Sequence, residues 1–194
     1  MNIAENILKH SLQNVYFLTG TALAGKTTMA KEIAGKYGFT PFHDNHNQSH
    51  FKVWESIRSK NIGSGVQPME YVEYVIIELV KLAQNNKVVA DASIPFELLK
   101  EISEYNRIAC MLALPELVTC ENYGNRDDHR DWLEWITSQE DAEQKLARQN
   151  EWFRTQTEQA FKDVKRLKLF SVVRTPDSTV ENSLRLLEEH FHLL

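Results

Sequence analysis

The sequence predicts an α/β domain built on a parallel sheet with right-handed crossovers. Short apolar runs of strand-forming residues alternate along the chain with longer segments whose apolar residues recur at helical spacing. Asp44 and Asp91 each follow such a run, as polar site residues do at the carboxyl edge of a parallel sheet. The chain has 194 residues, 42% of them hydrophobic, which is enough for one core. We therefore expect a single domain over residues 1–194.

The first predicted elements flank a loop that contains two glycines. Residues 3–8 have the spacing of a short helix, and residues 15–18 form an apolar run typical of a buried strand. Beyond the loop, apolar residues on one helical face continue to a stop at Gly38. Residues 39–44 are predicted to form the second strand, with Pro41 marking a strand start or an edge.

The remaining predicted elements continue this alternation. Further helices are expected at residues 49–59, 69–83, 95–104 and about 141–166, followed by a C-terminal helix capped by Asp177 or Ser178. Further strands are expected at residues 87–91, 107–114 and 167–173. Residues 121–143 are polar and acidic and can bury little surface on their own, so we expect a mobile segment there.

Residues 20–27, GTALAGKT, match the phosphate-binding pattern G-x-x-x-x-G-K-[ST] at every fixed position. The two glycines permit a backbone that wraps an anion and directs N–H groups at it. Lys26 is placed to reach the β- and γ-phosphates of a nucleotide, and the Thr27 hydroxyl to ligate Mg²⁺. The following helix directs its positive end at the phosphates. The predicted nucleotide-binding residues are Gly20, Thr21, Ala22, Leu23, Ala24, Gly25, Lys26, Thr27 and Thr28.

Charge and cysteine content limit the classes of partner. The formal net charge of −5 argues against broad binding to nucleic acid or to an anionic membrane, and no apolar run approaches the ~20 residues of a membrane span. Cys110 and Cys120 form no C-x-x-C pair, so we expect reduced thiols and a cytoplasmic protein. A GTPase is not expected, because no aspartate completes an N-K-x-D motif after Asn86 and Lys87.

Three arginines lie in or near the acidic segment, at positions 126, 130 and 148. With these residues, the phosphate-binding loop and the two aspartates at strand ends, the chain resembles the small P-loop kinases. That group includes nucleoside monophosphate, shikimate and gluconate kinases and some antibiotic phosphotransferases. The resemblance implies a P-loop NTPase fold of three α/β/α layers, whose five-stranded parallel sheet has the order 2-3-1-4-5. It also implies a substrate-binding section at about residues 45–85 and a small mobile lid at about 122–140, with ATP and Mg²⁺ as cofactors.

The predicted catalytic residues under this resemblance are Lys26, Asp44, Arg126 and Arg130. Asp44 would orient the acceptor hydroxyl and take its proton, and the alternative is a cap of the following helix. Arg126 and Arg130 are four residues apart, so on a helix they would share a face. There they would neutralise charge on the transferred phosphoryl group, and the alternative is a salt-bridged surface.

The predicted substrate-binding residues are Asp44, His46, Arg58 and Asp91, and the predicted metal ligands are Thr27 and Asp91. His46 would line the acceptor pocket, and Arg58 would hold an anionic acceptor. Asp91 would hold Mg²⁺ through water, and the alternative is a turn or cap residue. A zinc site that joins His43, His46 and His50 is not expected, because His43 belongs to the strand rather than to the following helix.

Together these residues predict an ATP- and Mg²⁺-dependent kinase that acts on a small-molecule acceptor. One alternative is a nucleotide-binding regulatory or degenerate P-loop protein that phosphorylates no acceptor. A nucleic-acid end kinase is disfavoured by the acidic late segment and by the lack of a basic stripe. Nucleotides, nucleosides, sugar acids and antibiotics are all open as acceptors. The sequence also leaves open the oligomeric state and the choice between ATP and GTP.

Overall fold

The computed structural model describes residues 3–44, 69–126 and 130–194. Its centre is a five-stranded sheet in which every pair of neighbouring strands is parallel. The strands are β1 (Val15–Gly20), β2 (Thr40–His43), β3 (Val88–Asp91), β4 (Ile108–Ala113) and β5 (Ser171–Arg174). Their order across the sheet is β2-β3-β1-β4-β5, which confirms the predicted order.

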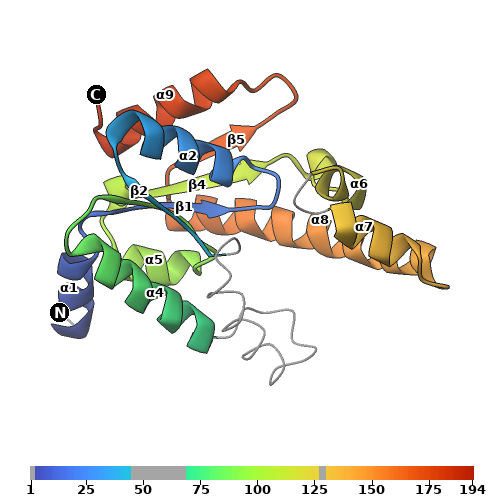
Figure 1. Cartoon of the computed structure of the whole chain (residues 1–194), viewed down its shortest axis with the longest axis horizontal. Coiled ribbons are helices and arrows are strands. Elements are labelled where there is room, and N and C mark those ends of the chain that lie inside the picture. Colours follow the sequence, from blue (N-terminus) through green and yellow to red (C-terminus); the bar gives the residue numbers. More distant parts are fainter. Residues whose placement is uncertain (1–2, 45–68, 127–129) are drawn as a thin grey trace.

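Helices cover both faces of this sheet (Figure 1). One face is covered by α2 (Lys26–Tyr37) and α9 (Val180–Phe191). The other is covered by α1 (Ile3–Ser11), α4 (Met69–Ala83), α5 (Phe96–Ile102) and the C-terminal part of α8 (Ala142–Leu167). Two short 3-10 helices, Tyr105–Arg107 and Pro115–Leu117, flank β4. The three predicted layers are therefore confirmed.

The central strand β1 explains why the sheet is buried on both faces. Val15 and Phe17 pack into the core below α1, α4 and α5, while Tyr16 and Leu18 pack against α2 and α9. When successive side chains of a strand enter cores on both faces of the sheet, its sequence is a continuous apolar run rather than an alternation of apolar and polar residues. The register pairs Leu18 with Asp91, so the chain leaves β1 beside the end of β3.

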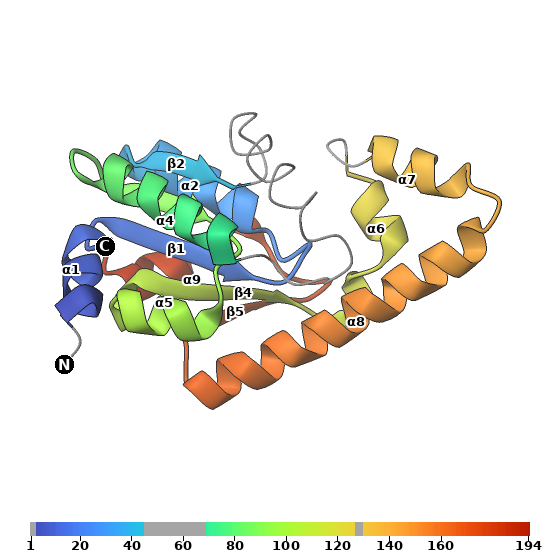
Figure 2. The same cartoon turned by 90° about the horizontal axis from the view of Figure 1, so that it is seen from below.

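A helical arm projects from the carboxyl side of the sheet. It comprises α6 (Cys120–Gly124), α7 (Arg130–Thr137) and the N-terminal half of α8, which extends well beyond the strands (Figure 2). The predicted lid at residues 122–140 falls mainly on α6 and α7. Tyr123 of α6 and Trp132 of α7 meet edge to face, with ring centroids 5.3 Å apart. The mobility of this segment stays a prediction.

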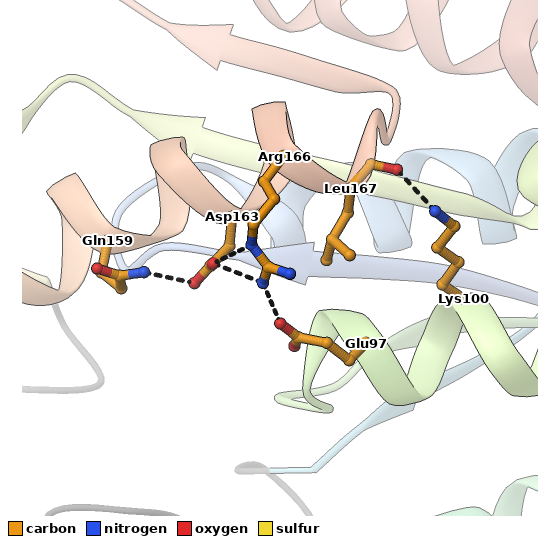
Figure 3. Close-up of polar contacts among 6 residues, drawn as sticks. All are labelled: Glu97, Lys100, Gln159, Asp163, Arg166 and Leu167. Atoms are coloured by element: carbon orange, nitrogen blue, oxygen red, sulfur yellow. Dashed lines mark hydrogen bonds and ion pairs between the residues drawn. The ribbon is translucent and has the colours of Figure 1, made fainter.

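The C-terminal end of α8 is tied to α5 by polar contacts (Figure 3). The Arg166 guanidinium binds both Glu97 of α5 and Asp163 of its own helix. Lys100 Nζ donates to the carbonyl oxygen of Leu167 at 3.2 Å, which satisfies one of the last carbonyls of α8. These contacts anchor the base of the arm to the sheet layer, because α5 itself packs on the core through Leu99 and Ile102.

Two sequence predictions about the C-terminal elements were wrong. The last strand was expected at residues 167–173, but α8 continues to Leu167 and ends at Lys168 in the left-handed region, with φ 55°. The strand begins only at Ser171, because the intervening residues turn the chain back toward β4. The cap of α9 is Thr179, whose hydroxyl accepts from the Asn182 N–H at 3.2 Å, rather than Asp177 or Ser178.

Some predicted features lie outside the described residues. These are the helix at residues 49–59, His46, His50, Arg58 and most of the substrate-binding section at 45–85. Of that section, the structure describes α4, whose apolar face includes Val72, Val75 and Leu79. Within the described ranges, no helix is both long and apolar enough to cross a bilayer.

Candidate active site

The phosphate-binding loop follows β1 and leads directly into α2. Gly20 has φ 120° and Gly25, the N-cap of α2, has φ 88°. A Cβ atom built on Gly20 would lie 2.0 Å from the carbonyl oxygen of Met111 in the neighbouring strand. The first glycine of the motif is therefore required both by its backbone conformation and by the close approach of β4.

Gly20→Ala is expected to destabilise the fold by roughly 2–4 kcal/mol, because the methyl group must displace backbone atoms of the central sheet. Chemical denaturation measures this loss. Gly35→Ala is the matched control, since nothing lies within 4 Å of its Cβ position inside α2. That variant should gain roughly 0.5–1 kcal/mol from helix propensity. Equal effects of the two substitutions would contradict the close-approach argument.

Thr21 joins the start of the loop to β4. Its N–H donates to the Met111 carbonyl at 3.0 Å, and its hydroxyl oxygen accepts from the Ala113 N–H at 2.8 Å. Its own carbonyl accepts from Lys26 Nζ at 2.6 Å. Thr21 is buried, so its side chain holds the loop against the sheet instead of facing the cleft. It was predicted only as part of the nucleotide-binding loop.

Thr21→Val is expected to cost roughly 1–3 kcal/mol of unfolding free energy, because the isosteric methyl group leaves the buried Ala113 N–H without its acceptor. Thr21→Ser keeps the hydroxyl and should recover most of that loss. Thermal or urea unfolding compares the two variants. If the serine variant were as unstable as the valine variant, packing of the threonine methyl group would explain the loss better than the hydrogen bond.

Thr27 and Asp91 meet at the N-terminus of α2. The Thr27 hydroxyl donates to Asp91 Oδ2 at 2.6 Å, and His43 Nδ1 lies 3.7 Å from the same oxygen. Burial opposes ionisation of Asp91, but His43, Lys26 and Thr27 outweigh it, so the pKa of Asp91 is lowered from its ordinary value. A hydroxyl beside an ionised carboxylate supplies the hard oxygen ligands that Mg²⁺ prefers, so this pair fits a magnesium ion.

Asp44 follows β2 and is buried, with 3% of its surface exposed. Its Oδ2 accepts from the Ser93 N–H at 2.8 Å, and its carbonyl accepts from the Tyr71 hydroxyl at 2.9 Å. Burial raises the pKa of Asp44 to about 6, and the nearby charge of Asp91 adds to the rise. The two aspartates therefore differ: Asp91 is held ionised, whereas Asp44 titrates close to neutral pH.

Lys26 begins α2, and its Nζ donates to the Thr21 carbonyl oxygen. Loss of hydration lowers the pKa of Lys26, against the raising effect of Asp91 and Asp44. The charge of Arg126 is a smaller cause that also lowers it. Arg126 is half-buried at the end of the α6 segment, whereas Arg130 is exposed as the first residue of α7. The catalytic roles of both arginines stay predictions.

The other predicted residues are placed as follows. Arg148 is exposed on α8, and its guanidinium lies 3.7 Å from a carboxylate oxygen of Asp141, which gives it a surface partner. Within the described part of the chain, no group of three or more His, Cys, Asp and Glu side chains is arranged to hold a metal. His46 and Arg58 lie outside the described residues, so their roles stay predictions.

Three residues at this edge were missed by sequence reasoning: His43, Ser93 and Arg174. His43 lies beside Asp91, and the Ser93 N–H binds Asp44. Arg174 ends β5, and its Nη1 donates to the carbonyl oxygen of Leu23 in the loop. The signal that could have found Arg174 is the one that found Asp44 and Asp91, a polar residue at the carboxyl end of a strand.

Comparisons with known proteins agree with this architecture. Neither a scan of protein-family models nor a search of curated proteins found a match. Among solved structures, the chain is similar to shikimate kinase from Acinetobacter baumannii in complex with shikimate, with a TM-score of 0.52 and 16% sequence identity. The alignment covers 97% of this chain and 96% of that chain. The protein therefore has the five-stranded P-loop α/β fold that this kinase shares.

Proposed function

We propose that the protein is an ATP- and Mg²⁺-dependent kinase that transfers the γ-phosphoryl group to a small-molecule acceptor. The observation that carries the proposal is the convergence of a loop lysine, a hydroxyl–carboxylate pair and a second, protonatable carboxylate at one edge of the sheet. A protein that only binds a nucleotide needs the first two features. A buried aspartate with a pKa of about 6 is an additional feature, suited to accepting a proton near neutral pH.

In this proposal the site residues bind the phosphate chain, hold the metal ion or act on the acceptor. The loop amides and Lys26 bind the phosphate chain, with Lys26 balancing its negative charge. Thr27 and Asp91 would hold Mg²⁺, which when bound neutralises charge on the β- and γ-phosphate oxygens. Asp44 orients the acceptor hydroxyl and accepts its proton, and Arg126 or Arg130 would neutralise charge on the transferred phosphoryl group.

The acceptor is proposed by class only. The similar shikimate kinase supports a small-molecule acceptor, but at 16% identity the likeness extends to the fold and not to the substrate. The acceptor must present a hydroxyl or phosphate oxygen beside Asp44, because phosphoryl transfer needs an aligned nucleophile. Nucleoside monophosphates, nucleosides, sugar acids including shikimate, and antibiotics with hydroxyl groups all meet this requirement.

An acceptor panel tests the proposal. The purified protein is incubated with Mg-ATP and each acceptor class in turn, and ADP release is followed together with the mass of the phosphorylated product. We expect one class to stimulate ADP release well above the acceptor-free rate, with a product heavier by one phosphoryl group. Replacement of Mg²⁺ by excess chelator should abolish the signal.

The regulatory alternative predicts a different result from the same panel. Mg-ATP would raise the melting temperature of the protein, but no acceptor would stimulate ADP release and no phosphorylated product would form. If that pattern persisted across all classes at pH values above and below 6, the kinase proposal would be rejected. If Mg-ATP did not raise the melting temperature at all, both the kinase hypothesis and the regulatory hypothesis would be wrong, because both require the loop to bind a nucleotide.

A further inference from the structure

Arg174 lies where β5 reaches the same edge of the sheet as the phosphate-binding loop. It pairs in register with Ala113 of β4, and its carbonyl accepts from the Leu114 N–H at 3.1 Å, so its backbone position is set by the sheet. Its exposed side chain extends from there to the loop, where Nη1 donates to the carbonyl oxygen of Leu23. The contact joins residues 151 positions apart in the chain.

Leu23 is the residue of the loop that most needs such support. Its φ of 58° places it in the left-handed region, which disfavours a side chain with a Cβ atom by roughly 1–2 kcal/mol. Of the three described non-glycine residues with positive φ, the other two, Lys168 and His192, terminate helices, where this conformation is common. Leu23 instead lies within the loop, between Gly20 and Gly25, so an outside contact must help to hold its conformation.

We propose that Arg174 is a positioning residue that holds the middle of the phosphate-binding loop in its anion-binding shape. Thr21 fixes the start of the loop to β4, Ala24 is buried in the core beside α2, and Gly25 caps α2, so the Arg174 contact acts on the left-handed residue between these fixed points. A charged donor on a carbonyl makes a strong hydrogen bond, and this bond uses a carbonyl oxygen of the loop rather than one of its N–H groups. The amides of the loop are thereby left to bind phosphate. This inference rests on the proposed function, in which the loop binds a phosphate chain.

The experiment compares ligand binding by wild type, Arg174→Ala and Arg174→Lys. Isothermal titration with Mg-ATP and with Mg-tripolyphosphate separates the phosphate chain from the base and ribose. Arg185→Ala is the control, because Arg185 is an exposed arginine on α9 whose partner is Glu189, at 2.6 Å, rather than the loop. Melting temperatures show whether each variant is folded. If the alanine variant is unstable, the comparison is made with the lysine variant instead.

We expect Arg174→Ala to bind both ligands roughly tenfold more weakly, because a hydrogen bond to a charged group contributes at this level. The lysine variant keeps a charged donor, so its affinity should lie between those of wild type and the alanine variant. The affinity of the control should equal that of wild type. The defect should persist in 1 M salt, where the Debye length is only ~3 Å, because a hydrogen bond within the protein is less screened than attraction at a distance.

Three results would overturn the inference. A defect for Mg-ATP without one for Mg-tripolyphosphate would assign Arg174 to the base or ribose. A loss of affinity that disappears in 1 M salt would mean that Arg174 acts by long-range electrostatic attraction rather than through the hydrogen bond. If Arg174→Ala bound both ligands as tightly as wild type, the loop would not need the Arg174–Leu23 hydrogen bond to bind phosphate. Failure of the proposed function is a separate result: without nucleotide binding, wild type itself would bind neither ligand, and without phosphoryl transfer the acceptor panel would fail while this comparison of affinities still held.

Discussion

Lys26→Ala is expected to lower turnover, and the affinity for Mg-ATP, by about a hundredfold or more. Lys26 is the loop cation, and it is poorly hydrated, which strengthens its interaction with an anion in the loop. Its loss also removes the positive charge that favours ionisation of Asp44 and Asp91. Both carboxylates should therefore titrate at higher pH in the variant, so the site loses phosphate affinity and ionised carboxylate together.

Titration calorimetry with Mg-ATP and steady-state kinetics with the active acceptor measure the effect of Lys26→Ala. Lys31→Ala is the matched control, because Lys31 is an exposed lysine on the same helix, α2, and its loss changes the net charge equally. The control should keep nearly wild-type binding. If both variants lost affinity equally, the effect would come from overall charge, and the assignment of Lys26 to the phosphates would fail.

Asp44→Asn is expected to lower turnover by about 10²–10⁴-fold, the usual contribution of a general base. The amide oxygen can still accept from the Ser93 N–H, so the local structure should be kept. Because the ionised form is the active one, wild-type kcat/KM should rise with pH, reach half of its maximum near pH 6 and level off about one unit higher. The variant should lack this rise.

The same substitution is expected to stabilise the fold at neutral pH. The pKa of Asp44 is about 6 in the fold and near 3.8 in the unfolded chain, so between these values the folded state binds more protons. Stability contributed by this group therefore falls as pH rises through that interval, by an amount on the order of 3 kcal/mol by pH 7. An asparagine carries no charge at any pH, so the variant should gain about 1–3 kcal/mol at pH 7.

Urea unfolding at pH 4, 6 and 8, for wild type and Asp44→Asn, measures this dependence. The difference between the two proteins should be small at pH 4 and largest at pH 8. Asp177→Asn, at an exposed position before α9, should show no such trend. A variant that became less stable than wild type as pH rose would mean that ionised Asp44 is favourably bound in the fold, contrary to its burial.

The five strands in their order, the phosphate-binding loop and the sheet edge where the candidate site lies could all be predicted from the sequence alone. Residues 20–27 carry a pattern that is local, since the glycines and the lysine act within one turn. Asp44 and Asp91 could be assigned to one edge from the chain alone, because parallel strands end on the same side of a sheet. The continuous apolar runs of β1, β3 and β4 predicted burial on both faces, which the two core layers confirm.

The differences between these residues arise from their contacts in the folded chain. Asp44 and Asp91 are equivalent in the sequence, but the hydroxyl of Thr27 and the imidazole of His43 lie beside Oδ2 of Asp91, whereas Oδ2 of Asp44 accepts from the Ser93 N–H. Arg126 and Arg130 are four residues apart in the sequence, but Arg126 lies between α6 and α7, whereas Arg130 is the first residue of α7. The Arg174 contact with Leu23 was not predicted at all. Periodicity and motifs report on neighbours within a few positions, whereas pKa values and hydrogen-bond partners depend on packing between distant segments, which is set by the complete fold.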